Sequence, residues 1–280
     1  MSGIVLAITR PDMKVSMIDT VHKKTAFLTQ VKAELSLANV TVYTKKVQDL
    51  EVSDKFDVIT SRAFADLSDF VEWSGHLLAE GVAEMKLDVP AAQQKQLMDY
   101  VQLMYKWNSV YNLTSLRDPM QMVTHHLLDS LAAVPAFQGA RNVLDVGAGG
   151  GLPGIVLAIA RPDMKVSMID TVHKKTAFLT QVKAELGLAK VTVYTKKVQE
   201  LEVSDKFDVI TSRAFADLSD FVEWSGHLLA EGGKFIALKG VAPSEERERL
   251  PGDWKVTDLQ PLQVPRLGAE RHLVFIERNV

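Results

Sequence analysis

The spacing of hydrophobic positions predicts two helices in the middle of the chain. Leu97, Val101 and Met104 recur every three or four residues, which is the period of an amphipathic helix. The same spacing predicts a second helix over about 120–133, which Pro135 should end. Together these helices predict a small helical region ahead of the second half of the chain.

From residue 142 onward, short apolar runs alternate with helical stretches. This alternation predicts an α/β fold, with a mostly parallel sheet covered by helices on both faces. The last two runs predict antiparallel strands. The expected strands cover 142–145, 165–170, 190–194, 207–211, 233–238, 254–256 and 272–276, and the expected helices 173–186 and 218–229.

A long internal repeat precedes the predicted sheet. Residues 3–81 recur as 154–232, and only four of the 79 positions differ. The first copy therefore repeats the second, third and fourth strands, but neither the first strand nor the loop after it. We expect a duplicated partial segment over 1–81, a helical cap over 82–140 and an α/β core over 141–280.

Composition is that of a globular protein, with 47% hydrophobic and 24% charged residues. No apolar run approaches the roughly 18 residues of a membrane-spanning helix, and Arg10 and Pro11 interrupt the apolar start. We therefore expect a cytoplasmic protein with no membrane contact.

The chain has no cysteine, which fits this location and excludes thiolate metal sites and a cysteine nucleophile. We expect no metal. The net charge of -3 provides no general attraction for nucleic acid.

The candidate ligand site is the glycine-rich loop after the first strand of the core. Gly147, Gly149 and Gly151 would let the backbone turn sharply and approach a ligand. Such a loop lies at the carboxyl edge of a parallel sheet, where ligands bind. Asp145 ends the strand before the loop. Asp170 ends the next strand, where an acid can accept hydrogen bonds from both ribose hydroxyls of a nucleoside.

Two cofactors compete for this loop. Gly149, Gly151 and Gly154 satisfy the G-x-G-x-x-G pattern of dinucleotide-binding proteins. Asp145 would repel a pyrophosphate, however, and it suits a ligand that carries a positive amino group. We therefore favour S-adenosyl-L-methionine over NAD.

The acceptor can be narrowed by what the chain lacks. Methylation at carbon-5 of a pyrimidine normally needs a cysteine nucleophile, which is absent. Methylation of exocyclic amines usually involves Asn/Asp-Pro-Pro-aromatic after the fourth strand, where this chain has Ser212-Arg-Ala-Phe215. A ring nitrogen such as guanine N7 needs neither, and it needs no general base. Catalysis would then rest on positioning and electrostatics, with no assigned catalytic residue.

Several longer motifs then point to one family. They read KWNSVYNLTSLRDP over 106–119, HLLDS over 126–130, DVGAGGGLPG over 145–154, SRAFA over 212–216, ALKG over 237–240 and ERHLV over 270–274. With these motifs, residues 84–280 resemble the bacterial 16S ribosomal RNA guanine-N7 methyltransferases, also called glucose-inhibited division protein B.

The resemblance implies a class I, Rossmann-like methyltransferase sheet with strand order 3-2-1-4-5-7-6 and a helical cap. It also implies S-adenosyl-L-methionine as the methyl donor and a guanine in 16S rRNA of the small ribosomal subunit as the acceptor. By the same resemblance, the residues that contact the cofactor are Gly147, Leu152, Val198, Gln199 and Arg213. Asp170, with Thr171 beside it, falls at the ribose of the cofactor.

The residues expected at the acceptor are Asn112, Arg117, His126, Lys239 and Arg271. Most of them also have a purely structural interpretation. Asn112 could end a helix, and His126 could pair with Asp129 one turn further on. Lys239 and Arg271 could be ordinary solvated charges.

The first copy poses a separate problem, because it lacks the central strand of its own sheet. Asp19 and Arg62 duplicate Asp170 and Arg213 without the loop between them. Both copies compete for one place beside the first strand, and direct connection favours the second copy by ~1–3 kcal/mol. We expect the first copy to be partly ordered, or to pair its second and fourth strands. Its exposed apolar faces would promote self-association.

Two alternatives to an active rRNA methyltransferase remain at this point. One is a variant of that enzyme which the duplication has impaired or left with a structural role. The other is a nicotinamide-dependent oxidoreductase, which the glycine pattern alone would permit.

Overall fold

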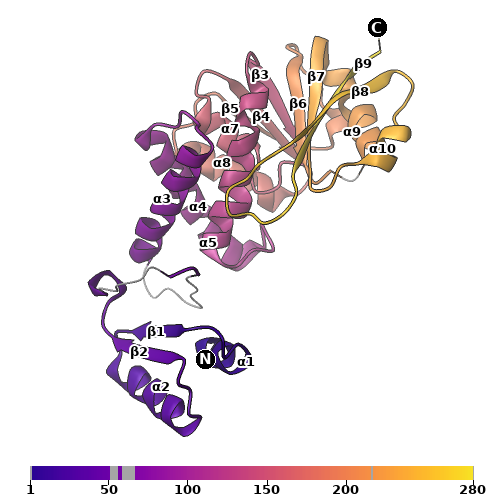
Figure 1. Ribbon diagram of the computed structural model, residues 1–280. Coiled ribbons are helices and arrows are strands. Elements are labelled where there is room, and N and C mark those ends of the chain that lie inside the picture. The colour runs from indigo at the N-terminus through magenta and orange to yellow at the C-terminus, as the bar shows by residue number, and fades with distance from the viewer. Residues whose placement is uncertain (1, 51–55, 59–66, 216, 280) are drawn as a thin grey trace. The chain divides into compact units, whose positions relative to one another are not determined.

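The computed structural model describes residues 2–50, 56–58, 67–215 and 217–279. The chain forms two compact units, residues 1–64 and 65–280 (Figure 1). The boundary lies ahead of the expected one at residue 81, because helix α3 (Leu67–Glu84) buries Leu78 and Val82 in the core of the second unit. Cap and sheet share that unit, and a division at residue 140 stays a prediction.

A seven-stranded sheet forms the centre of the second unit, in the order β5-β4-β3-β6-β7-β9-β8 (Figure 1). Numbered from β3, this is 3-2-1-4-5-7-6, which confirms the predicted order. The first five strands are parallel, and β9 and β8 add the two predicted antiparallel strands. The strands are β3 (Asn142–Val146), β4 (Lys165–Asp170), β5 (Val191–Thr195), β6 (Phe207–Arg213), β7 (Leu229–Lys239), β8 (Trp254–Pro261) and β9 (His272–Arg278).

Each face of this sheet has its own hydrophobic core, because successive side chains of a strand point to opposite faces. On β3, Val143 belongs to the core that contains α7 and α8, whereas Leu144 belongs to the core that contains α9. The strands beside β3 are β4 and β6, both from the second copy. The helical segments around the sheet are α7 (Gly154–Ala160), α8 (His173–Glu185), η4 (Val198–Glu200), α9 (Leu218–Ser225), η5 (Gly226–Leu228) and α10 (Ser244–Glu248).

The cap continues the first core away from the sheet. Leu97, Val101 and Met104 of α4 are fully buried, as their spacing predicts. The second predicted helix exists, although it contains a π-helical segment, and its last α-helical residue is Ala133, as predicted. Pro135 lies in the first turn of a 3-10 helix, where its missing N–H is tolerated. The cap segments are α4 (Ala91–Tyr111), α5 (Pro119–Met122), η2 (Val123–Leu128), α6 (Asp129–Ala133) and η3 (Val134–Phe137).

The first unit is a small α/β arrangement with two parallel strands, β1 and β2. Its buried core is formed by Ala7, Val15 and Val40. The expected pairing of its second and fourth strands is not seen in the described part, since residues 56–58 form no strand and 59–62, including Arg62, lie outside the described residues. Its segments are α1 (Ser2–Thr9), β1 (Val15–Asp19), α2 (His22–Glu34), β2 (Val40–Thr44) and η1 (Val47–Asp49).

Across the ranges that the structure describes, no helix is both long enough and apolar enough to cross a membrane.

Candidate functional site

The glycine-rich loop runs from the end of β3 to the start of α7. Gly147, Gly149 and Gly151 have φ angles of +67°, +58° and +94°, a backbone region that favours glycine. At Gly151 a Cβ atom would lie only 2.5 Å from Ile155 Cγ1. The N–H of Gly147 donates to the Ile169 carbonyl at 2.9 Å, which ties the loop to β4 and fixes its path.

Asp170 links the end of β4 to this loop. Its Oδ2 accepts a hydrogen bond from the Gly149 N–H at 3.0 Å, and its Oδ1 accepts one from the Val172 N–H at 2.9 Å. Its side chain is 6% exposed, whereas that of Asp19, the same position in the first copy, is 29% exposed. Asp19 accepts the equivalent bond from Val21, but no glycine loop precedes β1. The complete arrangement of glycine loop and acid therefore exists only where the loop precedes the second copy.

Asp145 lies at the other side of the loop and is completely buried. Its Oδ2 accepts a hydrogen bond from the Gly154 N–H at 2.8 Å, while its Oδ1 is buried with no partner among the described residues. Burial raises the pKa of Asp145 to about 7, although the Gly154 N–H and the charge of Arg213 both oppose the rise. A buried oxygen without a donor is costly, and a donor on a bound ligand would relieve that cost.

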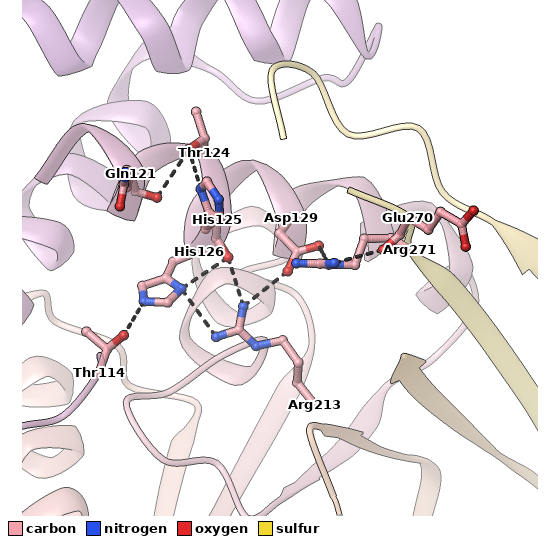
Figure 2. A network of polar contacts seen from close by, with 9 residues as sticks. All are labelled: Thr114, Gln121, Thr124, His125, His126, Asp129, Arg213, Glu270 and Arg271. Carbon is pink, nitrogen blue, oxygen red and sulfur yellow. Dashed lines mark hydrogen bonds and ion pairs between the residues drawn. The ribbon is translucent and has the colours of Figure 1, made fainter. Parts of the chain in front are cut away.

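Arg213, at the end of β6, reaches into the cap (Figure 2). It donates from Nη1 to the His125 carbonyl at 3.1 Å and to Asp129 Oδ2 at 3.2 Å, and its Nη2 lies 3.4 Å from His126 Nδ1. Arg271 Nε donates to the other oxygen of Asp129 at 2.8 Å. Cap, sheet and the segment before β9 therefore meet at one polar network.

His126 belongs to this network but does not pair with Asp129. Its Nε2 lies 2.9 Å from Thr114 Oγ1. Burial, and secondly the positive charge of Arg213, lower the pKa of His126 to about 4. The ring is therefore neutral at pH 7 and adds no third cation beside Arg213 and Arg271.

Asn112 and Arg117 brace the turn between α4 and α5. Asn112 ends α4 in the left-handed conformation, with φ of +51°, which matches the structural interpretation of this residue. Arg117 donates to the Asn108 carbonyl at 2.8 Å and also to Asn112 Oδ1. Both residues thus have structural contacts, while the side chain of Thr114 in the same turn touches His126.

The remaining predicted residues are distributed along the same edge of the sheet. Lys239, at the end of β7, forms an ion pair with Glu246 of α10 at 2.7 Å. It is therefore held on the opposite face of the sheet from Arg213, in agreement with strand alternation. Leu152 in the loop and Val198 in η4 are buried, whereas Thr171 and Gln199 are exposed.

The main role that the sequence reasoning missed is that of Asp129, which it considered only as a partner of His126. Its signal was present, because an acid stands among the buried positions Val123, Leu127 and Leu131 of the cap. A carboxylate on the apolar side of a helix needs a charged partner. The pattern gave no indication that the partners would be two arginines.

The strand order with its reversed β9, the loop with positive φ angles and the acid at the end of β4 together define a Rossmann-like methyltransferase. Residues 1–87 and 93–274 match the family described as rRNA small subunit methyltransferase G.

The chain is also similar to individual proteins named ribosomal RNA small subunit methyltransferase G. That of Herminiimonas arsenicoxydans is 69% identical over 207 residues, which cover 72% of this chain and 95% of the relative. That of Janthinobacterium sp. (strain Marseille) is 67% identical over 208 residues, covering 73% and 94%. That of Aromatoleum aromaticum is 51% identical over 210 residues, covering 74% and 100%.

The chain therefore belongs to the rRNA small subunit methyltransferase G family. This assignment confirms the predicted resemblance and leaves no support for the oxidoreductase alternative. These alignments include nearly the full length of each relative but only about three quarters of this chain. About a quarter of this chain is therefore additional to one methyltransferase.

Proposed function

We propose that this chain transfers the methyl group of S-adenosyl-L-methionine to N7 of a guanine in 16S rRNA of the small ribosomal subunit. The observation that carries the proposal is the pair of acids on either side of the glycine loop, which precedes the second copy. Asp170 is anchored to the loop through the Gly149 N–H, and Asp145 has a buried oxygen without a donor. The family assignment supports the same reaction class.

S-adenosyl-L-methionine fits these residues. Asp170 would accept hydrogen bonds from its ribose hydroxyls, and Asp145 would face its positive amino group. The glycines would let the backbone approach the ligand closely. We assign the cofactor contacts to Asp145, Gly147, Gly149, Gly151, Leu152, Asp170, Thr171, Val198, Gln199 and Arg213.

When bound, the cofactor supplies an electrophilic methyl carbon that a lone pair can attack directly. The residues of this chain then have to hold the acceptor ring in line and exclude water. None of them has to remove a proton, because guanine N7 carries no hydrogen. We assign acceptor contacts to Asn112, Arg117, His126, Lys239 and Arg271, of which His126 and Arg271 belong to the polar network around Arg213.

We further propose that the protein acts in the cytoplasm without membrane contact, and that the first unit promotes self-association. Support for self-association comes from the first copy, where Val5, Ile8, Phe27 and Leu35 are exposed. Exposed apolar side chains of this kind favour association where they gather into a patch. Sedimentation of the full chain over a range of concentrations measures it, and a monomer at every concentration would exclude it.

The experiment that tests the reaction uses small ribosomal subunits isolated from cells that lack the modification. Methyl-labelled cofactor and the full chain are added, and 16S rRNA is then cleaved chemically at N7-methylguanine. We expect label at one guanine, with none added to subunits that already carry the modification. Label on a pyrimidine or an exocyclic amine would contradict the proposed acceptor atom.

A further inference from the structure

A buried carboxylate joins the two arginines at the edge of the candidate site (Figure 2). Asp129, whose side chain is 4% exposed, accepts from Arg213 Nη1 at 3.2 Å and from Arg271 Nε at 2.8 Å. The three side chains come from α6, the end of β6 and the segment before β9. A buried charge of this kind is stable only when such partners surround it.

The network leaves donors free on both arginines. Arg213 uses Nη1 and Nη2 within the cap, and Arg271 uses Nε and Nη1. Arg213 Nε and Arg271 Nη2 donate to no residue in the described part of the chain. Their side chains are 22% and 24% exposed, so each arginine has one nitrogen without an acceptor among the described residues, on a partly exposed side chain.

The two arginines serve different sides of the site. Arg213 is the last residue of β6, the neighbour of β3, so it lies beside the glycine loop. Arg271 lies further along the edge, and a Cβ atom at Gly240, just after β7, would lie 3.9 Å from its Nη1. A guanidinium is well suited to a phosphate or to the O6 edge of a guanine. Arg213 therefore lies on the side of the glycine loop, and we assign Arg271 to the acceptor side.

We propose that Asp129 is a positioning residue that holds Arg213 and Arg271 in a fixed relation, so that methyl donor and acceptor guanine meet in line. The inference rests on the proposed function. One carboxylate contacts both cations and offsets their mutual repulsion, so its loss removes an anchoring contact from both arginines at once. Direct methyl transfer depends on the alignment of donor and acceptor. Loss of the Asp129 carboxylate should therefore weaken cofactor binding and slow turnover together.

The first test compares Asp129→Asn and Asp129→Glu with Asp99→Asn. Asp99 forms a surface ion pair with Lys95 on the cap at 2.7 Å and serves as the matched control. For Asp129→Asn we expect a dissociation constant for the cofactor at least fivefold higher, and kcat/KM on small subunits at least tenfold lower. Asp129→Glu should restore part of both, and Asp99→Asn should change neither. A lower melting temperature with unchanged binding and kinetics would overturn the proposal.

A double-mutant cycle keeps the proposal testable if Asp129→Asn does not fold. With Asp129 present, Arg213→Gln and Arg271→Gln should show coupled losses of kcat/KM, so that the double variant loses at least threefold less than the product of the single losses. If the loss of kcat/KM in the double variant equals the product of the two single losses, the two arginines act independently, and this would contradict their shared anchoring by Asp129. If the unchanged chain binds cofactor but methylates no rRNA, the proposed function fails. In that case the cofactor affinities of the Asp129 variants still test whether Asp129 positions Arg213.

Discussion

Asp145 and Asp170 are the same residue type in neighbouring strands, and their surroundings make them different. Asp170 receives two backbone N–H groups at the edge of the site. Asp145 receives one, and its other oxygen is buried without a donor. Burial therefore raises the pKa of Asp145 to about 7, so in the folded protein this carboxyl is mostly neutral below that pH.

We predict that Asp145→Asn makes stability less dependent on pH. In the unchanged chain the stabilising effect of neutral Asp145 is fully present below its unfolded pKa of 3.8, and it is lost as pH rises to the folded pKa of about 7. Asparagine does not titrate. The free energy of unfolding of the variant, relative to the unchanged chain, should therefore rise by up to about 4 kcal/mol across this window. Urea unfolding of both proteins at several pH values measures this difference in the free energy of unfolding. A difference that does not change with pH would contradict the raised pKa.

At this scale, sequence reasoning found the residues that lie next to the glycine loop along the chain or at strand ends. Asp145 and Asp170 are in that group, because strand ends can be recognised from hydrophobic runs. Asp129 was missed because its partners Arg213 and Arg271 lie 84 and 142 residues away. Local patterns do not specify which charges meet over such separations.

The two copies show which properties of an element are local. Helices α2 and α8 consist of the same thirteen residues and have the same bounds within each copy. Their burial differs, however: Phe27 is 54% exposed and Phe178 is 0% exposed. In the second copy, Trp107 of α4 packs against Phe178 with ring centroids 5.5 Å apart. The sequence therefore predicts the helix, and neighbouring elements determine its burial.

This difference predicts unequal effects of one substitution at two equivalent positions. Phe178→Ala should lower the free energy of unfolding by about 3–5 kcal/mol, because it opens a cavity beneath α4. Phe27→Ala removes an exposed ring and should change stability by no more than about 0.5 kcal/mol. Urea unfolding of the two variants provides the comparison, and equal losses would mean that the two helices are equally covered.

A glycine pair tests the loop in the same way. At Gly151 the φ angle is +94° and a Cβ atom would collide with Ile155, so Gly151→Ala should weaken both stability and cofactor binding. At Gly187 the φ angle is +64° but the space is open. Gly187→Ala should therefore cost only about 1 kcal/mol and leave cofactor affinity unchanged. Similar cofactor affinities for the two variants, measured by calorimetry, would argue against a close approach at the loop.

The elements of the second unit were largely predictable, since each predicted strand is present in the predicted order. The exceptions have physical reasons. Strand β7 begins at Leu229 rather than at Gly233, because pairing with β6 extends it across glycines that disfavour a strand. The π-helical segment from Val123 to Leu128 could not be predicted, because the spacing of its hydrophobic residues does not distinguish it from an α-helix.

At the scale of the whole molecule, the chain is one methyltransferase with an additional small unit. The second unit contains every strand of the sheet and both cores. In the described part of the first unit, the buried hydrophobic side chains are Ile4, Ala7, Val15 and Val40. A core of this size stabilises a unit weakly.

We therefore predict that brief proteolysis cuts preferentially within 1–81. The resistant fragment should retain cofactor binding, because the proposed cofactor residues all lie in the second unit. Mass spectrometry of the fragments and calorimetry of the product measure the two outcomes. Equal protection of both copies, or loss of binding with the first unit, would show that the first copy contributes to the site.

The most direct measurement of the central claim uses the duplication as its own control. Asp170→Ala and Asp19→Ala make the same change in the two copies, and calorimetry gives the cofactor dissociation constant of each full-length variant. Loss of charged hydrogen bonds at the ribose should weaken binding by Asp170→Ala roughly 10- to 100-fold, while Asp19→Ala should bind like the unchanged chain. Weakening by Asp19→Ala with normal binding by Asp170→Ala would show that the first copy holds the cofactor, and would contradict the account.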